Sequence, residues 1–182
     1  LAWSRGLGDV YKRQSYSTSG IHLCMVGPHT NFPLAGTSKG QTCISTSTPE
    51  AEIVAAALAL RSEGIPSLLL WDILLQEEGK EDVVRDVVLT FHEDNQAMIR
   101  IMETGRNPTM RTIARTHGVN IVQLHERFRE KDVKLIYTKS KDMRADIFTK
   151  GFTTPLEWDH ACRLINMYTM VEGSYETREL GE

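Results

Sequence analysis

The stretch Val87-Val88-Leu89-Thr90-Phe91-His92-Glu93-Asp94-Asn95-Gln96 decides the fold class of this chain. Its first five residues are apolar, β-branched or aromatic, a composition that predicts a buried strand. Acidic and amide residues follow, and a helix is predicted for 96–104. A buried strand that leads through an acidic turn into a helix is typical of α/β layers, where polar side chains gather at strand ends.

Upstream of this stretch, the sequence again predicts strands followed by a helix. Short strands are expected at 21–26 and 41–47, joined by a loop. Thr48 can cap a helix with a stripe of apolar residues, which Gly64-Ile65-Pro66 would end or kink. A second apolar helix is expected at 67–76, and the charged stretch 76–86 is expected to form a loop.

Downstream, the pattern predicts a long helix at 110–129 and a strand at 133–137. Asp142 can cap a short helix that contains Asp146. A terminal amphipathic helix is expected at 156–167, with four inward residues: Leu156, Ala161, Leu164 and Ile165. The predicted order is that of an α/β fold.

Length and charge limit the classes of protein to which the chain can belong. Its 182 residues and 41% hydrophobic content suit one well-buried domain. The net charge is −3, yet residues 100–150 hold 12 of the 21 Lys and Arg against 6 acidic residues. This local positive excess would suit a polyanionic partner, and a solvated charged face is the alternative interpretation.

Cysteine spacing and apolar runs indicate an intracellular protein without a membrane segment. Cys24, Cys43 and Cys162 lie far apart, so neither a zinc site nor a disulfide framework is predicted. The longest uninterrupted apolar run, 53–60, is shorter than the roughly 20 residues that span a bilayer. We therefore expect an intracellular setting and no membrane partner.

Three acidic residues stand where separate chain segments could deliver carboxylates to one pocket: Glu52, Asp94 and Asp146. Carboxylates brought together in this way can hold divalent cations. Each also has a simpler explanation. Glu52 could complement a helix dipole, Asp94 could cap the next helix unless Asn95 does so, and Asp146 could pair with a lysine four residues later.

Six motifs, in order along the chain, extend this set. They are Ser17-Thr18-Ser19-Gly20, Lys39 with Gln41, Ser47-Thr48-Pro49-Glu50-Ala51-Glu52, Asp94-Asn95-Gln96, Arg115-Thr116-His117, and Ala145-Asp146-Ile147-Phe148-Thr149-Lys150. Together they resemble the ribonuclease H domain of copia-type LTR retrotransposon polyproteins, the C-terminal part that follows the reverse transcriptase. The resemblance covers about 15–167.

This resemblance implies a ribonuclease H-like fold, a mixed central sheet flanked by helices. It implies cleavage of the RNA strand of RNA–DNA hybrids, with Glu52, Asp94 and Asp146 as catalytic, metal-binding carboxylates for two Mg²⁺ ions, for which Mn²⁺ can substitute. The implied partners are an RNA–DNA hybrid and the upstream reverse transcriptase domain, in a cytoplasmic particle or the nucleus. Lys139 and Lys141 are candidate phosphate contacts, with solvated loop lysines as the alternative.

The N-terminal region departs from the family pattern. Such enzymes carry another Asp on a first strand about a dozen residues before Ser17, and Asp9 lies too close to Ser17 to be that residue. Residues 1–14 lack clear helical and strand periodicity and resemble a foreign leader, with a short native strand or a disordered leader as the alternative. The first strand is expected to be missing or replaced. We expect a domain at 15–168, a disordered tail at 169–182 and impaired catalysis.

Two further classes of function stay open. A catalytically silent nucleic-acid-binding or connector module would share the fold and the basic half. An integrase-type polynucleotidyl transferase core is the third choice, although such cores resemble an Asp, Asp, Glu order and the acids here run Glu, Asp, Asp.

Overall fold

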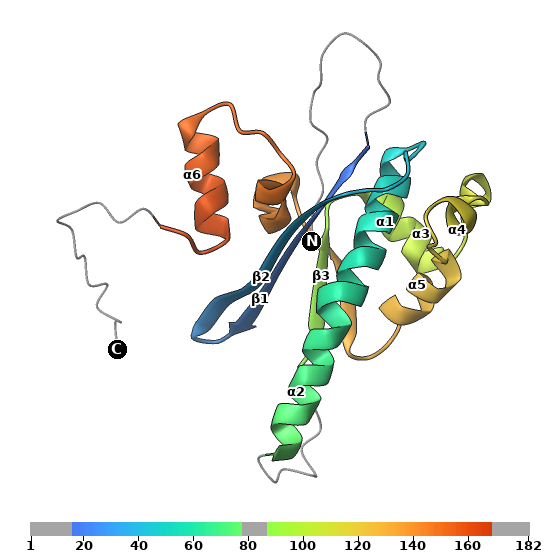
Figure 1. The fold of residues 1–182 in the computed structure, drawn as a ribbon. Coiled ribbons are helices and arrows are strands. Elements are labelled where there is room, and N and C mark those ends of the chain that lie inside the picture. The colour runs from blue at the N-terminus through green and yellow to red at the C-terminus, as the bar shows by residue number, and fades with distance from the viewer. Residues whose placement is uncertain (1–15, 78–86, 169–182) are drawn as a thin grey trace, which may run out of the picture.

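Two short sheets organise the molecule. In the computed structural model, which describes residues 16–77 and 87–168, β1 (Thr18–Gly27) pairs antiparallel with β2 (Thr30–Gly40). β3 (Leu89–Glu93) pairs in parallel with β4 (Val133–Tyr137). The α/β class predicted from the sequence is confirmed, but the described strands form two separate pairs and not one central sheet (Figure 1). The predicted strand at 41–47 is absent, because the hairpin takes in 30–40 instead.

One long helical rod lies beside β3 (Figure 1). It consists of α1 (Thr48–Ala59), a π-helical turn at Leu60–Gly64 and α2 (Ile65–Glu77). The predicted break at Gly64-Ile65-Pro66 coincides with this turn, and Pro66, which has no backbone N–H, lies in the first turn of α2. The rod has an apolar composition throughout: Thr48–Leu74 is long and apolar enough to cross a membrane, with mean hydropathy 1.5.

The two halves of this rod have different surroundings. In α1, Ile53, Ala56 and Ala59 are buried in the main core. In α2, Leu69, Leu70, Ile73 and Leu74 are exposed. The uninterrupted run 53–60 considered in the sequence analysis stops short of this span because Arg61 and Glu63 interrupt it. The rod is therefore long and apolar enough to cross a membrane, whereas no such segment was expected. Its first half, α1, is nevertheless a core helix.

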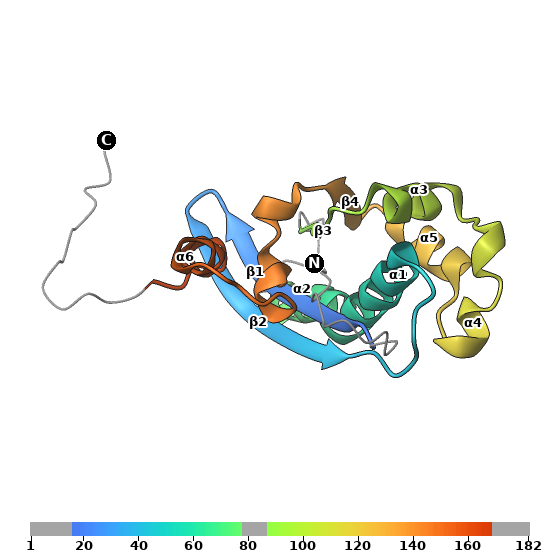
Figure 2. The same ribbon diagram turned by 90° about the horizontal axis from the view of Figure 1, so that it is seen from above.

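The helices after β3 cover the other side of α1 (Figure 2). They are α3 (Gln96–Thr104), a 3-10 turn (Pro108–Met110), α4 (Ile113–Thr116) and α5 (Ile121–Phe128). The predicted single helix at 110–129 is wrong. Gly118 adopts a left-handed φ of 66° and Asn120 caps α5 with its side chain, so the chain turns between α4 and α5.

The main core lies between α1, β3 and the helices that follow them. Its members are buried apolar residues from nearly every element of this half: Ile21, Ile53, Ala56, Ala59, Leu60, Phe91, Met98, Ile101, Met102, Met110, Ile113, Val119 and Leu124. Phe91 also makes an edge-to-face contact with Phe128, with ring centroids 5.2 Å apart. This packing fixes the end of β3 against the start of α1.

The C-terminal segment crosses back to the hairpin. Two 3-10 turns, η3 (Ser140–Asp142) and η4 (Arg144–Phe148), lead to α6 (Pro155–Leu164). Asp142 belongs to η3 and does not cap the turn that holds Asp146, whose N-cap is Met143. In α6, Ala161 and the following Ile165 are buried and Leu164 is half-buried, but the predicted inward Leu156 is 82% exposed. Residues 1–14, the expected tail 169–182 and most of the loop at 76–86 lie outside the described residues.

Candidate metal centre

The carboxylates of Glu52, Glu93 and Asp94 meet where the start of α1 approaches the end of β3. One oxygen from each lies within 4.8 Å of the others. Glu52 and Glu93 are buried, while Asp94 is half-buried. The structure thus brings together two of the three acids predicted from the sequence and adds a third, Glu93.

The residues that cap α1 and α3 determine where Glu52 lies and leave Asp94 available for the acid cluster. The Ser47 hydroxyl, not that of Thr48, accepts the first hydrogen bond of α1, from the Glu50 amide at 3.3 Å. Asn95 caps α3 by accepting from the Met98 amide at 3.0 Å. Asp94 is therefore not the cap, and its carboxylate can face Glu52 instead.

Glu93 was missed by the sequence analysis, although β3 contains the signal that identifies it. Side chains alternate across a strand, and Phe91 and Glu93 are buried while the alternate residues Thr90 and His92 are exposed. The alternation that assigns Phe91 to the core therefore assigns Glu93 to the same side. Its Oε1 accepts a hydrogen bond from the Asn95 amide at 2.9 Å.

Asp146 lies next to this cluster without belonging to its closest group. Its charge raises the pKa of Glu52, and the Asp94 charge raises the pKa of Asp146. Oδ2 of Asp146 forms an ion pair with the Lys150 ammonium, as its position four residues later suggested. Oδ1 of Asp146 is buried and has no hydrogen-bond partner.

Burial and mutual repulsion raise the pKa of three of these acids. Burial, reinforced by the charges of Glu93, Asp94 and Asp146, raises the pKa of Glu52 to about 10. Burial raises the pKa of Glu93 to about 7 against the opposing Asn95 amide. For Asp146, burial raises the pKa to about 6, although Lys150 opposes the shift.

The donor set suits a hard divalent cation. Oxygens on opposite sides of one such cation lie about 4–5 Å apart, which matches the spacing of the three carboxylates. A cation there would favour the ionised acids whose pKa values burial now raises. The three carboxylates could therefore hold a metal ion, and an all-oxygen donor set is typical of hard cations, whereas zinc favours nitrogen and sulfur.

Two exposed lysines lie on either side of Ser140, at the start of η3. The Ser140 hydroxyl donates a hydrogen bond to Oδ2 of Asp94. Lys139 and Lys141, the sequence candidates for phosphate contacts, adjoin Ser140 and are exposed. They therefore lie on the segment that touches the acid cluster.

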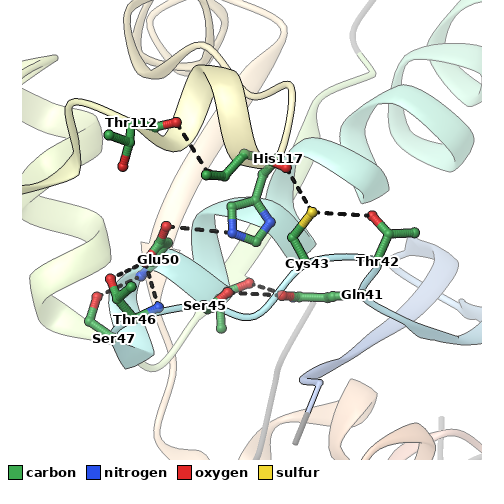
Figure 3. A network of polar contacts seen from close by, with 11 residues as sticks. Gln41, Thr42, Cys43, Ser45, Thr46, Ser47, Glu50, Thr112 and His117 are labelled. Atoms are coloured by element: carbon green, nitrogen blue, oxygen red, sulfur yellow. Dashed lines mark hydrogen bonds and ion pairs between the residues drawn. The ribbon is translucent and has the colours of Figure 1, made fainter. Parts of the chain in front are cut away.

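A second polar network anchors the chain before α1 (Figure 3). Glu50 accepts a hydrogen bond from the Thr46 amide at 2.7 Å, and its Oε1 lies 3.5 Å from Nε2 of His117. The Gln41 amide donates to the Ala51 carbonyl at 2.9 Å and to the Ser19 hydroxyl at 3.1 Å. Gln41 thus ties the start of α1 to β1, and the buried His117 lies against Glu50 without a hydrogen bond at its Nε2.

Comparison with protein-family models, curated proteins and solved structures gives no match. The assignment of function therefore depends on the residues and their geometry.

Proposed function

We propose that the chain is a ribonuclease H-type domain, from a copia-type retrotransposon polyprotein, that hydrolyses the RNA strand of RNA–DNA hybrids. The observation that carries the proposal is the meeting of Glu52, Glu93 and Asp94 within 4.8 Å at a strand end, with Asp146 coupled to them. Three chain segments distant in sequence contribute these acids, as a shared metal centre requires.

Glu52, Glu93 and Asp94 would hold the cation, and Asp146 would complete its surroundings once released from Lys150. Bound Mg²⁺ would activate the attacking water and stabilise the leaving 3′-oxygen. Within the chain, Asn95 keeps Glu93 oriented through its amide, and Ser140 keeps Asp94 oriented through its hydroxyl. Lys139 and Lys141 would contact phosphates of the hybrid.

Slow catalysis is part of the proposal. The described acids come from α1, the end of β3 and η4, and none comes from a further strand beside β3. A site that lacks a carboxylate from that direction would hold its cations less rigidly, and catalysis depends on positioning. Glu93 adds an acid next to Asp94, but both project from the same strand end.

Cleavage of a labelled RNA–DNA hybrid tests the proposal. The chain as given should cut the RNA strand slowly with Mg²⁺ and not with EDTA. Replacing residues 1–14 with a native first strand that carries an Asp should accelerate the cleavage, and Asp94→Asn in that protein should abolish it. Glu103→Gln, at an exposed position on α3, is the matched control and should leave the rate unchanged.

The catalytically silent binding module is the second candidate. The observation that favours it is the Lys150–Asp146 ion pair, which supplies a cation from the chain itself. If the restored protein binds the hybrid but does not cut it, the silent module replaces the nuclease. Rapid cleavage by the unmodified chain would instead show that a first-strand acid is not needed.

A further inference from the structure

The acids of the proposed centre fall into two groups. Oxygens of Glu52, Glu93 and Asp94 lie within 4.8 Å of one another, close enough to share one divalent cation. Burial and the charges within this group raise the pKa of Glu52, and the Asp146 charge adds to the rise. Of the acids coupled to Glu52, Asp146 is therefore the one left to hold a second cation.

Asp146 already has a cation from the chain itself. Its Oδ2 pairs with the Lys150 ammonium, while its Oδ1 is buried without a hydrogen-bond partner. The Asp146 side chain is 9% exposed, and the amides of Thr149 and Lys150 both donate to the Asp146 carbonyl, at 3.0 and 2.8 Å. An ion pair that is mostly buried and held by its backbone persists better than an exposed one, because breaking it leaves a buried charge without a partner.

The Lys150 ammonium acts on both groups of acids. Burial raises the pKa of Glu52 and of Asp146, and the ammonium opposes each rise. A second divalent cation at Asp146 would have to take Oδ2 from Lys150 and lie close to its positive charge, which repels it. The chain therefore holds a competitor at the acid that a second cation needs.

We propose that Lys150 controls how many divalent cations the centre holds. While its ammonium pairs with Asp146, the group of Glu52, Glu93 and Asp94 binds one cation. A second cation binds only when it displaces Lys150, and it is therefore held more weakly than the first. The role of Lys150 rests on the proposed function, because it requires a metal centre at these acids.

Mn²⁺ titration of the full chain tests this role, with electron paramagnetic resonance of the free ion as the measure of stoichiometry. The unmodified chain should bind one Mn²⁺, and a second ion at least about tenfold more weakly. Lys150→Gln removes the charge but keeps a hydrogen-bond donor for Asp146, and it should strengthen binding of the second ion at least about tenfold. Lys150→Arg keeps the charge, and Lys134→Gln removes an exposed positive charge from the opposite end of β4. Both should bind Mn²⁺ as the unmodified chain does.

Acylation of Lys150, measured by mass spectrometry, tests the same role without a substitution. In the unmodified chain it should stay slow while the first ion binds and accelerate as the second ion displaces the ammonium from Asp146.

Two ions of similar affinity on the unmodified chain would overturn the role of Lys150. An unchanged second ion in Lys150→Gln would do the same, as would acylation that does not follow the second ion. In each of these cases the metal centre itself would stand. If none of the proteins bound Mn²⁺, the metal centre would be wrong, and the proposed function would fail with it.

Discussion

Glu52 carries the largest electrostatic cost in the described part of the molecule. It is buried among three other acids, and its pKa rises to about 10 from an ordinary value of 4.5. Without a cation, Glu52 therefore holds a proton at neutral pH and can donate a hydrogen bond to a neighbouring carboxylate. A bound cation would replace that proton, so metal binding should release protons.

Stability without metal should fall as pH rises. Folded Glu52 and Glu93 bind protons that the unfolded chain releases above about 4.5, because their folded pKa values are about 10 and about 7. The contribution of Glu52 to the free energy of unfolding is fully present below pH 4.5. It falls by about 1.4 kcal/mol per pH unit as the pH rises toward 10. Urea unfolding in EDTA from pH 5 to 8 should show at least this slope, because Glu93 and Asp146 add to it at the lower end of the range, and Glu52→Gln should reduce it.

Glu103→Gln, at an exposed position, is the control for this titration and should keep the slope of the unmodified chain. Parallel pH profiles for the unmodified chain and Glu52→Gln would contradict the buried, proton-holding state of Glu52.

Glu93 should matter for metal binding even though it is absent from the family-like motifs. Mg²⁺ at ten times its dissociation constant should stabilise the unmodified chain by about 1.4 kcal/mol. Glu93→Gln should reduce this gain because the cation loses one of three oxygens held within 4.8 Å. Thermal melts in EDTA and in millimolar Mg²⁺ measure the effect, and an equal gain in both proteins would remove Glu93 from the centre.

At the scale of elements, the turn between β3 and α3 connects the fold to the site. Asn95 caps α3 through its side chain and also donates its amide to Glu93. One residue thus fixes both the start of a helix and the direction of an acid. A mutation can separate the two roles, because only the capping of α3 uses the side chain of Asn95.

Asn95→Ala should cost about 1 kcal/mol of stability through loss of the cap. It should also weaken Mg²⁺ binding, since a frayed start of α3 loosens Asp94 and Glu93. Asn120→Ala removes the equivalent cap of α5, which accepts from Val122 and Gln123, and is the matched control. Both variants should lose similar stability in urea, but only Asn95→Ala should change the Mg²⁺ dissociation constant measured by calorimetry.

Local patterns predicted the elements whose cause is local. The strand at 133–137 and the helix at 96–104 match the structure, because alternation, a cap and a following left-handed Gly105 specify them within a few residues. The hairpin partner of β1 was misplaced because pairing register is a non-local choice that local residue preferences do not determine. The long helix at 110–129 failed at Gly118, whose left-handed φ the helical periodicity does not reveal.

The site residues also divide into those that local sequence predicts and those that depend on distant segments. Glu52, Asp94 and Asp146 were named from sequence, and two of them meet within 4.8 Å. Of their ordinary explanations, capping by Asp94 is excluded because Asn95 takes that role, whereas the pairing of Asp146 with Lys150 is present. The Asp146–Lys150 pair was predictable from spacing, whereas the orphaned Oδ1 depends on burial by segments distant in sequence.

At the scale of the whole molecule, charge is divided between the acidic centre and the basic stretch 100–150. Lys139 and Lys141 stand beside the acids, while Lys131 and Lys134 lie at the opposite end of β4. A hybrid whose scissile phosphate reached the acid cluster would meet the first pair and not the second. The two pairs therefore offer matched positions for measuring phosphate contacts.

Alanine at Lys139 and Lys141 should weaken hybrid binding and reduce the slope of log affinity against log salt by roughly 1–2. Alanine at Lys131 and Lys134 should leave the slope close to that of the unmodified chain. Fluorescence anisotropy with a labelled hybrid measures both slopes. The salt concentration is varied from roughly 50 to 200 mM, the range in which counterion release dominates. Equal slopes for the two double variants would place the hybrid elsewhere.

Gly36 gives the hairpin an unusual sensitivity to sequence drift. It is an exposed residue of β2, yet a Cβ there would lie 2.4 Å from Cζ of Phe148, whose ring stacks on His22. Any side chain must push this aromatic ring aside, two residues from Asp146. In a saturation library that is sorted for fold retention, position 36 should therefore favour glycine over larger residues, although exposure alone would score it as freely variable.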